Sequence, residues 1–122
     1  MTAAVTVSVL ASGTAWATGA ALFNAGEYWE AHEAWEPLWL RSEGRERRLL
    51  AGVILLAAAL HKAHKMENPR GGRRNYDKAL AHLEHLPDRY EGVEVRRLEA
   101  EVARALEDPD LRPQLPLVKV QA

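Results

Sequence analysis

Four residues of this sequence combine side chains and spacing that could do chemistry: His32, Glu33, Glu36 and His61. Imidazole and carboxylate groups ligate Zn, Mn or Fe, so together the four could hold a divalent transition metal. His32 and Glu36 also lie one helical turn apart, so His32 could act as a general base beside a carboxyl group whose pKa is raised by burial. The motif H-E-x-x-E begins like the zinc-protease motif H-E-x-x-H but ends in glutamate.

Aromatic residues share a helical face with this pair. At 100° per residue, several side chains fall within about 60° of His32, namely Tyr28, Trp29, Trp35, Glu36 and Trp39. A helix buries such a stripe, so we expect His32 and Glu36 to be buried and therefore paired, coordinated or functional. Tyr28 and Trp35 would line a binding site beside them, although aromatic side chains on one face are more often simply core.

Three interpretations of these residues stay open. We favour a pocket between two helices, lined by His32, Glu33, Glu36 and His61, that binds a metal or a small molecule. In the second interpretation the same groups form a buried hydrogen-bond network, with Glu36 accepting from His32 or His61, in a structural or partner-binding helical module. In the third interpretation the protein is a small hydrolase that uses His32 and Glu36.

A second candidate site is basic. Six cations lie within a short stretch, namely Lys62, Lys65, Arg70, Arg73, Arg74 and Lys78. Arg73 and Arg74 follow two glycines in the first turn of an expected helix, where backbone amides and the helix dipole attract anions. A phosphate or a carboxylate could bind there. The alternative is a solvated basic face that Glu67 and Asp77 partly neutralise.

Composition narrows the functional classes. The 122 residues are enough for one domain, and 48% hydrophobic with 27% charged residues is ordinary for a globular protein. The formal net charge of −1 provides no overall attraction for nucleic acid. We therefore expect a small molecule or a protein as partner, and the apolar content is compatible with a homodimer. The chain has no cysteine, which excludes disulfides and thiol chemistry and favours the cytoplasm.

The beginning of the chain contains a possible processing signal. Ala15-Trp16-Ala17 matches an A-x-A cleavage site, but no lysine or arginine occurs before Arg41. The positively charged segment of a signal peptide is missing, so we do not expect one. No apolar run reaches the roughly 18–20 residues of a membrane span, so we expect no membrane association.

The spacing of apolar residues and helix breakers predicts an all-α, single-domain bundle of about five helices. Helices are expected over residues 14–25, 27 to a kink or restart at Pro37, 45–67, 72–86 and 93–106. Loops or turns are expected at 68–72 and 88–92. Residues 1–12 would form a flexible or extended lead and residues 13–107 the helical domain. Residues 108–122 would form an extended tail, with three prolines, lying on the surface by Leu115 and Leu117.

The helix over residues 45–67 is expected at the centre. From Leu49 to Leu60 it is apolar on all sides, as in a helix that others enclose. His61 continues one line of that helix and would face the His32 region. His82 and His85 fall outside the apolar stripe of the helix over 72–86, so we expect both to be solvated.

Four stretches of the chain resemble the DUF309 family of small helical proteins. They are FNAGEYWEAHEAWEPLW, LLAGVILLAAALHK, NPRGGRRNYDKALAHLEHLP and YEGVEVRRLEAEV. The first matches the family pattern at Phe23, Gly26, Tyr28, Glu30, His32, Glu33, Glu36 and Trp39. The chain has Ala51 and Leu55 where the family often has glutamine. The resemblance implies a compact all-helical fold and brings no established activity with it.

Overall fold

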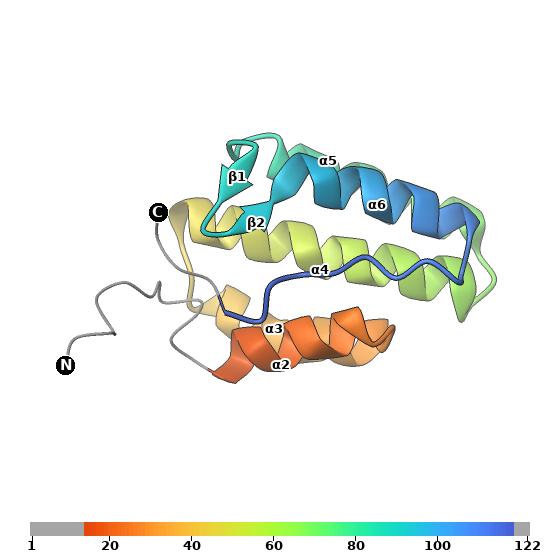
Figure 1. The fold of residues 1–122 in the computed structure, drawn as a ribbon, viewed down its shortest axis with the longest axis horizontal. Coiled ribbons are helices and arrows are strands. Elements are labelled where there is room, and N and C mark those ends of the chain that lie inside the picture. Colours follow the sequence, from red (N-terminus) through yellow and green to blue (C-terminus); the bar gives the residue numbers. More distant parts are fainter. Residues whose placement is uncertain (1–13, 119–122) are drawn as a thin grey trace.

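Five helices and one short hairpin make up the regular structure of residues 14–118, the part of the chain that this computed structural model describes (Figure 1). The elements are α2 (Thr14–Asn24), α3 (Tyr28–Leu40), α4 (Gly44–His64), α5 (Pro69–Leu83), β1 (Arg89–Tyr90), β2 (Val93–Glu94) and α6 (Val95–Glu107). The predicted all-α bundle is confirmed. The predicted lead over residues 1–12 and the end of the predicted tail, 119–122, lie outside the described residues.

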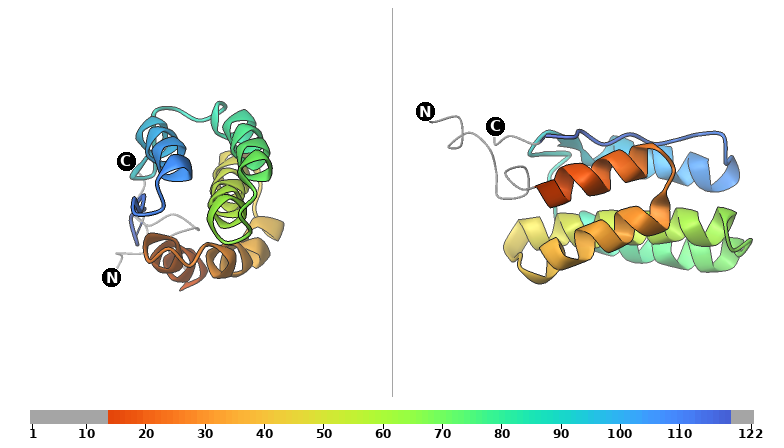
Figure 2. Two further views of the ribbon diagram at one scale, coloured as in Figure 1. Left: turned by 90° about the vertical axis from the view of Figure 1, so that its right-hand side faces the viewer. Right: turned by 90° about the horizontal axis from the view of Figure 1, so that it is seen from below.

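Helix α4 is the centre of the bundle, as its all-round apolar sequence predicts. It packs against α3, α5 and α6, and Figure 1 shows it running between the α5/α6 layer and the α2/α3 layer. Figure 2 shows the same arrangement along the helix axes. Its buried residues are Leu49, Leu50, Ala51, Gly52, Val53, Leu56, Ala57, Ala59 and Leu60. Small residues let α5 approach closely, because a Cβ on Gly72 would lie 2.8 Å from the carbonyl oxygen of Ala59.

Helices α2 and α3 meet through two tryptophans. The rings of Trp16 and Trp35 stack with their centroids 5.5 Å apart, and the indole nitrogen of Trp35 donates to the carbonyl oxygen of Trp16 at 3.3 Å. Both side chains are fully buried, as is Phe23, which the sequence places on the same face of α2. Gly19 makes room for the Trp35 ring, since a Cβ at this position would lie 2.2 Å from the indole nitrogen.

Two of the differences from the predicted helix bounds have a clear local reason. Residues 68–72 are not a loop, because the Asn68 side chain accepts from the Gly71 amide and Pro69 begins α5. Helix α3 continues through Pro37 to Leu40, so the predicted restart is wrong. Glu33 and Pro37 are both exposed, so water can bond the Glu33 carbonyl that proline leaves without its helical donor.

The hairpin was not predicted. Arg89 pairs with Glu94 and Tyr90 with Val93, across a two-residue turn in which Glu91 has φ 50° and Gly92 has φ 87°. Two positive φ angles in a two-residue connection define the type I′ turn that joins antiparallel strands. The strands escape detection by periodicity because each contains only two residues.

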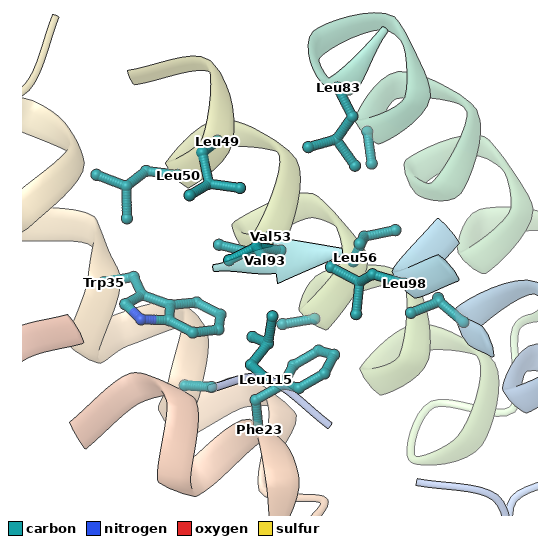
Figure 3. Close-up of a cluster of buried hydrophobic side chains, with 14 of the residues drawn as sticks. Phe23, Trp35, Leu49, Leu50, Val53, Leu56, Leu83, Val93, Leu98 and Leu115 are labelled. Carbon is teal, nitrogen blue, oxygen red and sulfur yellow. The ribbon is translucent and has the colours of Figure 1, made fainter. Parts of the chain in front are cut away.

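The tail beyond α6 packs on the core through Leu115. Asn24 fixes it by donating to the carbonyl oxygen of Leu115 at 2.9 Å and accepting from the Leu115 amide at 2.7 Å. Leu115 is buried beside Phe23 (Figure 3), whereas Leu117 is half exposed, so only one of the two predicted anchors is used. Trp16 adds a bond to the carbonyl oxygen of Pro116 at 3.0 Å. Among the described residues, no helix is long and apolar enough to cross a membrane.

Candidate functional site

The buried face of α3 is not centred on His32. Its buried residues are Tyr28, Ala31, Trp35 and Leu38. At 100° per residue their mean direction lies roughly 80° from His32. His32 is therefore at the edge of the buried face, and Glu33 and Glu36 are exposed. The expectation of a buried His32–Glu36 pair is wrong, because α3 must pack against α2 as well as α4.

The predicted polar contacts of His32 are not formed. No hydrogen bond joins it to Glu36 within residues 14–118, and its Nδ1 atom is buried without a hydrogen-bond partner there. The buried network that would lock α3 against α4 is consequently not present around this pair. Tyr28 and Trp35 belong to the core: Tyr28 packs edge-on against Phe23, and burial raises the pKa of its hydroxyl.

The four predicted metal ligands do not gather. Within residues 14–118, no three His, Asp or Glu side chains lie close enough together to hold a metal ion. Glu33 and Glu36 are exposed to solvent, and the His61 ring contacts Trp29. The predicted four-residue metal centre is therefore not formed.

The structure instead brings His32 and His61 into contact with one tryptophan. The Trp29 ring stacks on the His32 ring with centroids 4.8 Å apart and an interplanar angle of 8°. The His61 ring lies 5.4 Å from Trp29 at an angle of 37°. Trp29 remains 43% exposed, so part of its aromatic surface faces solvent beside the two imidazoles.

A cleft of about 340 Å³ opens beside this cluster, and we call it the Trp29 cleft. It is lined by α3, α4, α5 and the connection between the last two, through Trp29, Ala58, His61, Lys62, Met66 and Asn75. The lining combines an aromatic ring, an exposed thioether, an ammonium, an imidazole and an amide. Such a mixture of apolar surface with a few convergent polar groups is typical of small-molecule sites. Of the residues expected at the site, only His61 lines the cleft itself.

The groups of the predicted anion site at the start of α5 are only partly engaged by the protein. The Gly71 amide donates to Asn68, and Arg73 lies 3.6 Å from the Asp77 carboxylate and over the ring of Tyr76. Arg74 is exposed. Anion binding at this position stays a prediction.

A second cleft, of about 580 Å³, was missed by sequence reasoning. It lies between the first turns of α4 and the end of α5, and we call it the arginine cleft. Its lining residues are Trp39, Gly44, Arg45, Arg47, Arg48, Ala51, His82 and His85. His85 is exposed as predicted, but His82 is half-buried and bonds to Arg48 at 3.3 Å. The only signal in the sequence is the presence of basic residues both at the start of α4 and at the end of α5. Their proximity depends on how α4 and α5 pair.

Protonation of His82 is disfavoured in this cleft. Burial lowers the pKa of His82 from its ordinary value of 6.5, and Arg48 and His85 lower that pKa further. Because a guanidinium only donates, the bond from Arg48 requires an unprotonated Nδ1 on His82.

This arrangement predicts a pH-dependent contribution to stability. A lowered folded-state pKa means that His82 contributes stability above the unfolded pKa and that this contribution is lost as pH falls below about 6.5. The unfolding free energy of the wild type should fall relative to His82→Gln between pH 7.5 and about 5.5 in urea titrations. A difference between the two proteins that stays constant with pH would contradict this prediction.

The polar contacts that do fix the helices lie away from His32. His64 bonds the carbonyl oxygen of Ala105, joining α4 to α6 at 2.6 Å. Tyr76 donates to the carbonyl oxygen of Glu99 at 2.8 Å. Arg96 donates to the carbonyl oxygens of Leu83 and Leu86 at the end of α5. Hydrogen bonds from side chains to backbone carbonyls therefore take the role expected of the His/Glu network.

Two proteins with similar sequence are described as uncharacterised or hypothetical. A protein of Aquifex aeolicus (strain VF5), described as uncharacterised, is 29% identical over 85 residues, which are 69% of this chain and 25% of that protein. The chain thus spans about a quarter of the length of that relative. The crystal structure of a conserved hypothetical protein from Thermus thermophilus is 49% identical, with a TM-score of 0.67. The similarity covers 75% of this chain and 95% of the Thermus chain.

The first two of the four stretches that resemble DUF309, and the beginning of the third, lie within a family match. The family model described as "Domain of unknown function (DUF309)" matches residues 16–75, which include Trp29, His32 and His61. This confirms the resemblance predicted from the motifs. The chain belongs to the DUF309 family.

Proposed function

We propose that the protein binds a small planar carboxylate in the Trp29 cleft. The observation that carries the proposal is the exposed indole of Trp29, held against His32 in the wall of a cleft that also presents an ammonium group. Exposed tryptophan surface is costly to leave in water and pairs well with planar ligands. The cleft volume of about 340 Å³ lies within the range of small-molecule sites.

Each polar group of the cleft has a role in this proposal. Lys62 supplies a positive charge for a carboxylate, and Asn75 can donate or accept one hydrogen bond at the opposite helix. His61 borders the same space and can donate from either ring nitrogen according to its tautomer. Within residues 14–118, no ion pair engages Lys62, so its charge is available to a ligand.

His32 supports the site from behind Trp29. Its ring lies parallel to the indole, and a stacked pair of this kind restricts the tryptophan rotamer. Its buried Nδ1 atom has no hydrogen-bond partner within residues 14–118, so the His32 ring contacts its surroundings mainly through this stack. We therefore assign His32 as a positioning residue for Trp29 and leave no acid–base role to Glu36.

Titration with benzoate and with its neutral isostere benzamide tests this proposal. In amide-resolved NMR spectra, benzoate should cause saturable shifts at His61, Lys62 and Asn75, with a dissociation constant of order 1 mM, and benzamide should bind several-fold more weakly. Trp29→Ala should abolish the shifts. Lys62→Gln should remove the difference between the two probes.

The matched control is Trp39→Ala, which removes a half-buried tryptophan at the other end of the same helix. It should leave benzoate binding unchanged. Equal binding by Trp29→Ala and wild type, or no saturable shift with benzoate up to about 20 mM, would overturn the proposal.

A further inference from the structure

The arginine cleft is positively charged through its three arginines. Every titratable side chain that lines it is basic: Arg45, Arg47, Arg48, His82 and His85. The acidic neighbours on the chain, Glu43 and Glu46, are not among the lining residues. No ion pair within residues 14–118 engages any of the three arginines. Like charges gathered around a cavity repel one another, and an anion in the cavity would relieve that repulsion.

The three arginines are not equivalent. Arg47 is committed to the fold, because its guanidinium lies 4.2 Å from the Trp39 ring centroid and donates to the carbonyl oxygens of Trp39 and Ser42. It closes the end of α3. Arg48 makes one bond, to His82, and retains its other donors. Arg45 is exposed at the cleft.

The backbone adds to the same charge. Helix α4 begins at Gly44, which lines the cleft, and the side chain of the preceding Glu43 forms no capping bond. A Cβ on Gly44 would meet nothing within 4 Å, so the first turn is open on that side. The first amides and the positive dipole end of a 21-residue helix therefore lie beside two arginines and two histidines.

We propose that the arginine cleft binds a phosphate monoester. Arg45 and Arg48 hold the phosphate, as guanidinium groups match its oxygens in bidentate geometry, and the first amides of α4 complete its hydrogen bonds. His85 lines the same space. The organic part lies along Ala51 and the edge of Trp39, the apolar part of the lining. This site is independent of the Trp29 cleft, since Arg48 and His61 are 13 positions apart on α4, or roughly 20 Å.

Phosphate titrations at constant ionic strength test this proposal. Inorganic phosphate should shift the amides of residues 44–48 and the ring signals of His82 and His85 saturably, whereas the same ionic strength of chloride should not. Phenyl phosphate should bind several-fold more tightly than inorganic phosphate. Arg45→Gln/Arg48→Gln should weaken both by at least about 10-fold.

The control variant removes two arginine charges at a different place on the protein. Arg73→Gln/Arg74→Gln, at the start of α5, should bind both phosphates like the wild type, and so should Trp29→Ala. Circular dichroism checks that all variants are folded. Equal weakening in the two arginine pairs would show a non-specific charge effect and would overturn the proposal. Shifts that track ionic strength alone, or equal affinity for the two phosphates, would contradict a monoester site.

Discussion

Replacing Trp35 with alanine should lower the free energy of unfolding by about 3–5 kcal/mol, whereas replacing Trp29 should lower it by about 1 kcal/mol or less. Both residues are tryptophans of α3, and they differ in the direction in which their side chains point. Trp35 is fully buried between α2 and α4, stacked on Trp16 and bonded to its carbonyl oxygen. Trp29 is 43% exposed and loses little packing on truncation.

Urea unfolding followed by far-ultraviolet circular dichroism measures both variants without relying on tryptophan fluorescence. The pair is a direct test of the orientation of α3. If the stripe were centred on His32, both tryptophans would lie equally far from its centre, at about 60° on either side. Similar losses in the two variants would therefore contradict the observed rotation of the buried face.

Gly19→Ala should destabilise the wild type by about 1–3 kcal/mol, although alanine favours a helix by about 1 kcal/mol over glycine. The new Cβ would lie 2.2 Å from the Trp35 indole nitrogen and 2.5 Å from two ring carbons. The ring cannot turn aside, because it is fully buried and stacked on Trp16. Strain in the α2–α3 contact therefore outweighs the gain in helix propensity.

A double-mutant cycle isolates this contact. In the Trp35→Ala background the clash is removed and the new methyl group partly fills the cavity, so Gly19→Ala should become neutral or stabilising. Trp35→Leu serves in place of Trp35→Ala where the latter is too unstable for a complete unfolding curve. A loss from Gly19→Ala that is the same with and without the Trp35 ring would show that the cost lies in α2 itself.

The two proposed sites occupy opposite ends of one helix pair. The arginine cleft is built at the start of α4 and the end of α5, and the Trp29 cleft at the end of α4 and the first half of α5 (Figure 1). Both depend on the close approach that Gly52 and Gly72 allow, since a Cβ on Gly52 would lie 2.3 Å from Leu83. Helix α4 thus serves as the scaffold that positions both sets of side chains.

Periodicity predicted the helices well where the pattern is long. The buried residues of α2 and α6, including Phe23, Leu98 and Val102, recur at helical spacing within the predicted helices. The central position of α4 follows from an apolar run that no single face can contain. Short features were not predicted. A two-residue strand shows no periodicity, and the start of α5 depends on one hydrogen bond from the Gly71 amide to the Asn68 side chain.

The candidate site was predicted less well, and α3 shows why. Counting aromatic residues placed His32 at the centre of the stripe, but Trp29 and Glu36 lie on the exposed side of it. Ala31 and Leu38 are buried instead, because they face the groove between α2 and α4. The residue types of one helix do not show which part of its apolar surface the neighbouring helices will cover.

Local periodicity and motifs are enough to predict that this protein is a helical bundle around α4. That His32 and His61 both contact Trp29, and do not share a metal with Glu33 and Glu36, depends on the tertiary structure. It also decided that Arg48 meets His82. Such contacts join residues far apart in the chain, and their geometry is set by helix rotation and crossing, which no short stretch of sequence encodes.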